Sequence, residues 1–356
     1  MVKLAITNSS TSFIFTISEK SAKLTIGTPF PSGSTASYAL LANSTFSIKT
    51  DLSPTFTFSE KSILAEVDEV VAHPEFKGYI SDLGGPSANM YRMKGKVQEI
   101  CDRCSSPSCI HPVICNNLDT SHKPMTELYR KVDKHPGVKK AFVGSGIRYD
   151  LLVDDFNQNN EDNNHEEYIE QVITRHVSGR LKVAPEHTSD ATLKVMRKPS
   201  FKYFHKFKEK YDQISEKHGL KQQLIPYFIS SHPGCENEDM ANLAVETKDM
   251  GFQLEQVQDF TPTPMTVATV IYYSGVHPYT LKPYKTIKDK EEKLNQRRFF
   301  FWYKRENHSY IRESLRKANR LDLADKLIGS KPQQNSSEKP MPKWLEERRS
   351  RKGKKK

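Results

Sequence analysis

The chain has 356 residues, enough for one large domain with its own core or for two smaller ones. Its hydrophobic fraction of 36% and its mean hydropathy of −0.67 are low for a fully globular chain, which indicates that part of it does not pack. It has no apolar run near the roughly 18 residues that a membrane span needs and no signal-peptide pattern at its start. A cytoplasmic protein without a membrane partner is therefore expected.

Most of the positive charge lies at the carboxyl end. The net charge is +11, and residues 331–356 hold ten Lys or Arg against three Glu, so the rest of the chain is only mildly basic. A basic tail of this kind is typical of a solvated, disordered terminus. It is also suited to weak, salt-sensitive and non-specific contact with nucleic acid, and the sequence leaves both interpretations of residues 330–356 open.

Residues 1–58 and the segment after them differ in pattern. The first 58 residues contain no cysteine, are rich in Ser and Thr and show no sustained periodicity, so we expect them to be poorly ordered and to lie outside the core. Ser59 is suited to cap a helix. The apolar residues that then share one helical face are Ile63, Leu64, Val67, Val70 and Val71. Organised protein is expected to begin at Ser59.

Beyond Ser59, apolar runs alternate with amphipathic stretches of helical length. The runs are 79–83, 140–143, 180–184, 224–229 and 254–258, and the helices between them include 168–173, 203–214 and 240–250. Strands separated by such helices predict parallel β-α units in a barrel-like or doubly wound α/β sheet. In both arrangements the ligand binds at the carboxyl ends of the strands.

Polar residues follow every run, and glycines follow three of the five. The segments are DLGGPSAN (82–89), GSGIRYD (144–150), PEHT (185–188), SSHPG (230–234) and DFTPTP (259–264). Glycine lets backbone amides approach a ligand closely, and polar groups at successive strand ends would surround a pocket. Arg148 either binds a ligand carboxylate or forms an ion pair with Asp150. His187 and His232 either face that pocket or are structural.

Four motifs, in order along the chain, closely resemble the YgiQ family of radical S-adenosylmethionine (SAM) proteins. They are GYISDLGGPSANMY (78–91), SGIRYD (145–150), LKVAPEHT (181–188) and PYFISSHPG (226–234). The resemblance runs from about residue 59 to about residue 329. It implies a partial (β/α)6 TIM-like barrel, a [4Fe–4S] cluster and SAM. The substrate is unknown, and a flavodoxin or ferredoxin is the implied reductant.

The resemblance also implies roles for particular residues. Gly84 and Gly85 match the glycine pair after the second barrel strand, whose backbone receives the methionine end of SAM. Glu186 follows the strand that helps to hold the ribose and amino acid of SAM. Arg148 is a further candidate cofactor-binding residue because of its place beside Asp150, and not because of the resemblance. The catalytic residues are not identified by the resemblance.

One family motif is missing from the sequence. The first barrel strand of such enzymes ends in C-x-x-x-C-x-x-C, which holds three irons of the cluster and leaves the fourth open to SAM. Residues 1–58 contain no cysteine. We therefore expect a barrel over residues 59–329 that lacks its first strand, in a truncated or misjoined chain that is inactive by itself.

The four clustered cysteines form a second candidate site. Cys101, Cys104, Cys109 and Cys115 have the spacing C-x2-C-x4-C-x5-C, which matches neither a zinc ribbon nor the radical SAM motif. Dense cysteines in a reducing compartment favour zinc or an auxiliary iron–sulfur cluster, and free or redox-active thiols are the alternative. The sequence thus predicts a radical SAM enzyme of unknown reaction, with a non-catalytic RNA- or protein-binding module as the alternative.

Overall fold

The fold is taken from a computed structural model of the chain. The structure describes residues 59–84, 88–106, 108–153, 164–254, 257–264 and 266–329, together with the backbone of four strands before Ser59. Residues 330–356, and with them the expected basic tail, lie outside the described residues.

Three of the early strands pair with one another. β1 (Val2–Asn8), β2 (Thr11–Ser18) and β3 (Ser21–Gly27) form an antiparallel sheet. Val2, Leu4 and Ile6 alternate with less apolar residues at the period of a strand. The expectation that residues 1–58 are poorly ordered stays a prediction. Most of residues 28–58 lie outside the described residues.

A fourth strand corrects the expectation that the parallel sheet lacks its first strand. β4 (Ser47–Ile48) pairs in parallel with β6 (Asp82–Leu83), and α1 (Glu60–Ala72) lies between them in the chain. The alternation of Phe46 and Ile48 with polar neighbours suits a strand. A β-α-β unit therefore begins before Ser59, although β4 is short and pairs with β6 alone among the described strands.

The remaining parallel strands follow in chain order. β5 (Tyr79–Ile80) pairs with β7 (Lys140–Ala141), and an isolated parallel bridge joins Ile147 to Val183 of β8 (Arg180–Glu186). β8 pairs with β9 (Gln223–Ser230), and β9 pairs with β10 (Gln258–Asp259). β4 with β6, β5 with β7, and β8 with β9 and β10 thus form small parallel sheets that do not close into a barrel within the described residues.

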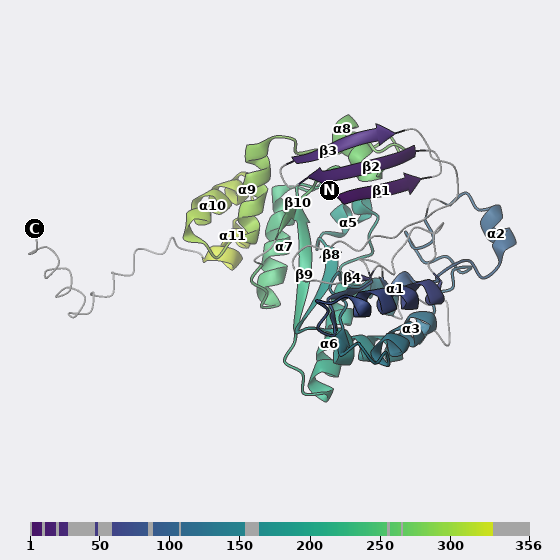
Figure 1. Ribbon diagram of the computed structural model, residues 1–356. Coiled ribbons are helices and arrows are strands. Elements are labelled where there is room, and N and C mark those ends of the chain that lie inside the picture. The colour runs from purple at the N-terminus through teal and green to yellow at the C-terminus, as the bar shows by residue number, and fades with distance from the viewer. Residues whose placement is uncertain are drawn as a thin grey trace, which may run out of the picture.

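Helices connect these strands and cover the sheet (Figure 1). They are α2 (Gln98–Asp102) and α3 (Lys123–Asp133) before β7, α4 (His165–Gln171) with the π turn Val172–His176 before β8, α5 (Asp190–Met196) and α6 (Lys202–Lys217) before β9, and α7 (Asn237–Asp249) before β10. Short 3-10 turns lie at Ala88–Met90, Tyr149–Leu152 and Arg305–Asn307. The alternation predicted by the sequence is thus present.

The first helix shows why these segments fold as they do. The hydroxyl of Ser59 accepts a hydrogen bond from Ser62 N at 3.0 Å, which confirms the predicted N-cap. Ile63, Val67 and Val70 are buried, while Leu64 and Val71 are partly buried and pack against the same core. Burying an aliphatic side chain of this size contributes roughly 1.5–3 kcal/mol, so the apolar stripe holds α1 on the sheet.

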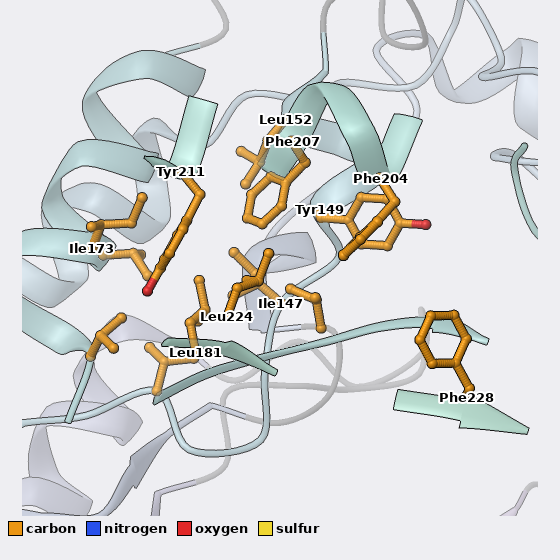
Figure 2. Packing of buried hydrophobic residues seen from close by; sticks show 14 of the residues in the cluster. Ile147, Tyr149, Leu152, Ile173, Leu181, Phe204, Phe207, Tyr211, Leu224 and Phe228 are labelled. Carbon is orange, nitrogen blue, oxygen red and sulfur yellow. The ribbon is translucent and has the colours of Figure 1, made fainter. Parts of the chain in front are cut away.

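The core between α6 and the sheet is rich in aromatic side chains (Figure 2). Phe204, Phe207 and Tyr211 project from α6 and are buried, and Tyr149 lies edge-on to Phe204 with ring centroids 5.8 Å apart. Leu181 and Leu224, from β8 and β9, complete this layer. The packing fixes the strand ends from which the candidate site is built.

Four helices follow β10. They are α8 (Val267–Ser274), α9 (Lys290–Phe300), α10 (His308–Lys317) and α11 (Leu321–Ile328). Of these, α9, α10 and α11 pack against α7. The side chain of Gln296 on α9 accepts a hydrogen bond from Ser231 N at 2.8 Å and donates one to Cys235 O at 3.1 Å. This buried amide ties α9 to the turn after β9. No helix among the described residues combines the length and apolar character needed to cross a bilayer.

Candidate functional site

The candidate site lies where the parallel strands end. Because β6, β7, β8 and β9 run in parallel, their carboxyl ends meet at one edge of the sheet. Gly84 follows β6, the loop 144–150 follows β7, and Glu186 is the last residue of β8. The structure therefore gathers the segments that the sequence singled out.

Asp82 fastens the loop after β7 to the end of β6. Its Oδ1 accepts hydrogen bonds from Gly144 N at 2.8 Å and Ser145 N at 3.0 Å, and its Oδ2 accepts one from the hydroxyl of Ser145. A Cβ atom on Gly144 would lie 2.8 Å from the carbonyl oxygen of Ser81. Glycine is therefore required there for the two strand ends to approach each other.

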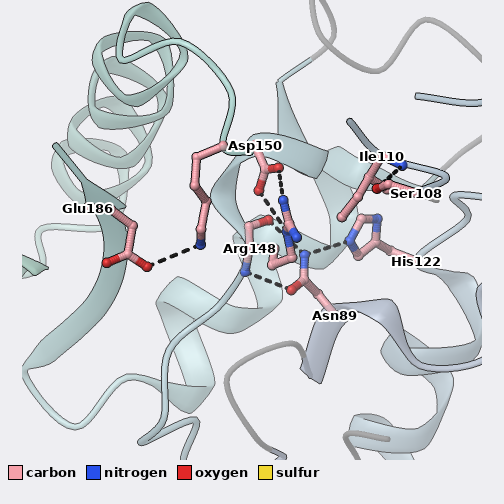
Figure 3. Close-up of polar contacts among 8 residues, drawn as sticks. Asn89, Ser108, Ile110, His122, Arg148, Asp150 and Glu186 are labelled. Atoms are coloured by element: carbon pink, nitrogen blue, oxygen red, sulfur yellow. Dashed lines mark hydrogen bonds and ion pairs between the residues drawn. The ribbon is translucent and has the colours of Figure 1, made fainter. Parts of the chain in front are cut away.

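Asn89 makes the second connection at this edge (Figure 3). Its Oδ1 accepts from Arg148 N at 2.8 Å, and its Nδ2 donates to Arg148 O at 2.9 Å and lies 3.2 Å from His122 Nε2. Asn89 is only 1% exposed, so these bonds are shielded from water. The segment that follows the glycine pair is thereby held against the backbone of Arg148.

The guanidinium of Arg148 is committed to Asp150. Arg148 Nε donates to Asp150 Oδ1 at 3.1 Å, and a terminal nitrogen makes a second, shorter contact with Oδ2. Burial lowers the pKa of Arg148, but Asp150, with smaller contributions from Tyr149 and Glu186, more than offsets this and the pKa is raised. The sequence left open whether Arg148 binds a ligand carboxylate or pairs with Asp150, and the structure contains the ion pair. Arg148 stays positively charged in this pair.

Glu186 ends β8 in an unusual conformation. Its φ is +68°, in the left-handed region that is uncommon for residues other than glycine. Its Oε1 lies 3.1 Å from Nζ of Lys198, which comes from the connection between α5 and α6. Such a backbone conformation at a strand end is frequent at binding sites. Glu186 therefore presents a carboxylate at this edge, paired with Lys198 and near enough to Arg148 to affect its pKa.

The glycine pair is described only in part. Gly84 is buried, with a φ of +146°, and directly follows β6. Gly85 lies outside the described residues, so its expected contact with SAM stays a prediction. In the loop after β7, Gly146 has a φ of +95°, and a Cβ on it would lie 2.6 Å from Lys182 O.

His187 and His232 are both buried and hold the turns after β8 and β9. Nδ1 of His187 accepts from Thr188 N and Ser189 N, each at 3.0 Å, so Nε2 carries the proton and faces Cys235 Sγ at 3.4 Å. Burial and nearby His232 lower the pKa of His187 to about 3. The structural interpretation of these histidines is the one that the geometry supports.

Two residues of this site were missed by the sequence analysis. Asn89 lies inside the segment 82–89, but nothing in the pattern indicated that its amide would bond to Arg148, 59 positions away. His122 is buried, and burial together with His165 holds its pKa well below the usual value. A signal was present for Asn89 alone, because a polar residue three positions after a Gly-Gly-Pro sequence is suited to join strand ends.

The four cysteines lie away from the sheet in the segment 98–116. This cysteine segment contains α2 and is closed at its base by backbone bonds from Lys96 N to Asn117 O (2.7 Å) and from Asp119 N to Lys94 O (2.8 Å). All four thiols are free. Partial desolvation and the charges of Cys115, Cys101 and Cys104 raise the pKa of Cys109.

Their arrangement does not match a closed metal centre. In the part of the chain that the structure describes, no group of three or more His, Cys, Asp or Glu is placed to hold a metal ion. Cys104 and Cys109 are exposed, whereas Cys101 lies against Gly95 and accepts from Asn117 Nδ2 at 3.2 Å. Metal binding here stays a prediction that requires the cysteine segment to rearrange.

The amino-acid sequence of this chain is similar to those of several known proteins. A UPF0313 protein of Bacteroides thetaiotaomicron is 59% identical over 273 residues, which are 77% of this chain and 44% of that protein. The chain is homologous to UPF0313 proteins. UPF0313 is the YgiQ family, which agrees with the resemblance found in the four motifs.

Two further relatives extend the comparison. The UPF0313 protein of Porphyromonas gingivalis is 56% identical, over 76% of this chain and 43% of the relative. That of Methanosarcina acetivorans is 43% identical, over 74% of this chain and 34% of the relative. The chain thus spans less than half the length of these relatives. Residues 255–339 match a domain of unknown function, DUF3362, which includes α8 to α11.

Proposed function

We propose that the described part of the chain is the SAM-binding portion of a radical SAM enzyme. The observation that carries the proposal is the junction at Arg148, where the segment after the glycine pair bonds to the backbone of the loop after β7, close to Glu186 of β8. Three segments that match family motifs meet there. The resemblance assigns SAM to this edge of the sheet.

The strand order supports a partial TIM-like barrel. Parallel strands that pair in chain order, each followed by a helix, are the arrangement from which such barrels are built. β4 then takes the place of the first strand, and β5 with β6 the place of the second. On this proposal the mouth of the barrel is the edge that carries Gly84 and Glu186.

The residues at this edge suit SAM chemically. A carboxylate accepts hydrogen bonds from ribose hydroxyls and attracts a cationic amino group. Glu186 offers such a carboxylate, while the buried ion pair of Arg148 and Asp150 keeps the neighbouring loop rigid. Backbone approach at Gly84 is unobstructed by a Cβ atom. We propose that Gly84 and Gly85 line the methionine end and Glu186 the ribose.

The iron–sulfur cluster does not fit the described cysteines. In the enzymes that the motifs resemble, the cluster and SAM together start radical chemistry on the substrate. Among the residues that the structure describes, no three cysteines converge as a cluster requires, and we derive no step through it. Zinc or an auxiliary cluster at Cys101, Cys104, Cys109 and Cys115 remains a separate proposal.

Photo-crosslinking tests the proposed SAM site. Irradiation of the 356-residue chain with radiolabelled SAM, followed by peptide mapping, is expected to label peptides from residues 79–92 or 180–198. Excess unlabelled SAM serves as the competitor. The proposed site would be contradicted if the label fell only outside these two regions, or if excess unlabelled SAM did not reduce the labelling.

A further inference from the structure

A cavity of about 600 Å³ opens between the cysteine segment and the connection from α5 to α6. This volume is in the range of sites that enclose small ligands. One wall comes from His111, Pro112 and Ile114 of the cysteine segment. The opposite wall comes from Lys194, Lys198 and Lys202. The cavity therefore lies between the cysteine segment and the connection from α5 to α6, and the proposed SAM site accounts for neither wall.

The walls of this cavity carry a surplus of positive charge. Lys194, Lys198 and Lys202 line it, and among the lining residues that the structure describes the one carboxylate is Asp190. Both oxygens of Asp190 are engaged, with Ser200 Oγ at 3.1 Å and Phe201 N at 3.3 Å. Partial burial, Arg197 and Lys194 lower the pKa of His111 on the facing wall. A ligand at neutral pH would therefore meet the lysine cations on one wall and an uncharged imidazole on the other.

The first turn of α6 adds to this field. Lys202 and Tyr203, which line the cavity, are the first two residues of this 16-residue helix. Their amides already bond to Oγ and O of Ser200, at 3.4 and 3.2 Å. The helix therefore contributes the partial positive charge of its amino end rather than free N–H donors. Phosphate groups are commonly bound in such surroundings.

Lys198 connects the cavity to the strand-end edge. It lines the cavity, and its Nζ lies 3.1 Å from Oε1 of Glu186. A ligand held by Lys194 and Lys202 would therefore have its other end close to Glu186. This is the place where a substrate must lie if SAM binds at that edge.

We propose that the cavity binds the phosphate or pyrophosphate group of a small-molecule substrate of this same site. The assignment of the anion as a substrate rests on the proposed function, whereas its binding by the lysines does not. Lys194 and Lys202 hold the anion through charge-assisted hydrogen bonds. Lys198, paired with Glu186, marks the boundary between the anion and SAM.

Calorimetric titration with pyrophosphate at low ionic strength tests this inference on the 356-residue chain. Lys194→Gln and Lys202→Gln are each expected to weaken pyrophosphate binding by about tenfold, the lower limit for losing a charge-assisted hydrogen bond. Lys221→Gln is the matched control. Lys221 is exposed and lies just before the amino end of β9, whereas the proposed SAM site lies at the carboxyl ends of the strands. It should bind pyrophosphate like the unmodified chain.

A parallel titration with SAM separates the two proposals. Pyrophosphate binding that depends on Lys194 and Lys202 supports the anion site even if SAM does not bind, and in that case the proposed function fails alone. The anion site is overturned if pyrophosphate does not bind, if Lys194→Gln and Lys202→Gln bind it unchanged, or if Lys221→Gln weakens it equally. Unchanged melting temperatures would show that the variants are folded.

Discussion

Asn89 connects more of the candidate site than any other side chain in Figure 3. Replacing it with Ala removes the bonds to N and O of Arg148, two part-buried backbone groups. We expect Asn89→Ala to lower the free energy of unfolding by about 2–4 kcal/mol, measured by urea denaturation. Gln98→Ala, which removes an exposed bond within α2, should change it by less than about 0.5 kcal/mol. Equal effects of the two variants would contradict the central position of Asn89.

His187 and His232 predict how stability depends on pH. Burial lowers the pKa of His187 to about 3 and that of His232 to about 4, below the value of about 6.5 for an unfolded histidine. Between these values the unfolded chain binds more protons than the folded chain, so stability is full above pH 6.5 and falls as the pH drops toward 4.

Substitution at His187 tests this pH dependence. We expect His187→Gln to give a shallower loss of stability between pH 6.5 and 4 than the unmodified chain, measured by denaturation at several pH values. His277→Gln is the control, because His277 makes the same type of contact, with the amides of Tyr279 and Thr280, in a surface loop. An identical slope in the unmodified chain and His187→Gln would refute the prediction.

At the scale of elements, glycines set how closely the strand ends approach. A Cβ on Gly146 would lie 2.6 Å from Lys182 O, whereas a Cβ on Gly179 meets nothing within 4 Å. The two glycines have nearly the same φ, +95° and +101°. Gly146→Ala should therefore destabilise the fold by about 1–3 kcal/mol more than Gly179→Ala, measured by thermal or urea unfolding. Equal destabilisation by Gly146→Ala and Gly179→Ala would contradict the prediction, because it would mean that the loop after β7 moves to accommodate a Cβ atom at little energetic cost.

The strands show how far the sequence alone determines this fold. The runs at 180–184 and 224–229 lie within β8 and β9, because alternating burial of residues such as Leu181 and Val183 is visible as a period of two. The run at 254–258 overlaps β10 only at Gln258. β4 was not anticipated, since two residues cannot establish a period. Pairing with a partner 35 positions away decides whether such a segment becomes a strand.

The location of the candidate site could be predicted from the sequence, but the contacts between its side chains could not. Parallel strands bring their ends together in any such sheet, so the edge that carries Gly84, Arg148 and Glu186 followed from strand order. The bond from Asn89 to Arg148 and the pair between Glu186 and Lys198 depend on the paths of two loops. Loop paths are set by packing against distant residues, and no local pattern in the sequence encodes them.

At the scale of the whole molecule, the positions of the cysteines predict that the 356-residue chain does not cleave SAM by itself. The sequence holds five cysteines and no C-x-x-x-C-x-x-C motif, and Cys101 to Cys115 follow β6 rather than β4. After anaerobic reconstitution with iron and sulfide and reduction by dithionite, we expect the 356-residue chain to form no 5′-deoxyadenosine. Product that is lost on Cys101→Ala or Cys104→Ala would show that the cysteine segment binds the catalytic cluster.

The central claim is that SAM binds at the carboxyl ends of the parallel strands. Isothermal titration of the 356-residue chain with SAM measures this directly, with Glu186→Gln as the test and Glu209→Gln as the control, since Glu209 is exposed on α6. We predict saturable binding that Glu186→Gln weakens by about tenfold, as expected for the loss of one charge-assisted contact, and that Glu209→Gln leaves unchanged. No measurable SAM binding, or equal binding by Glu186→Gln and the unmodified chain, would contradict the claim.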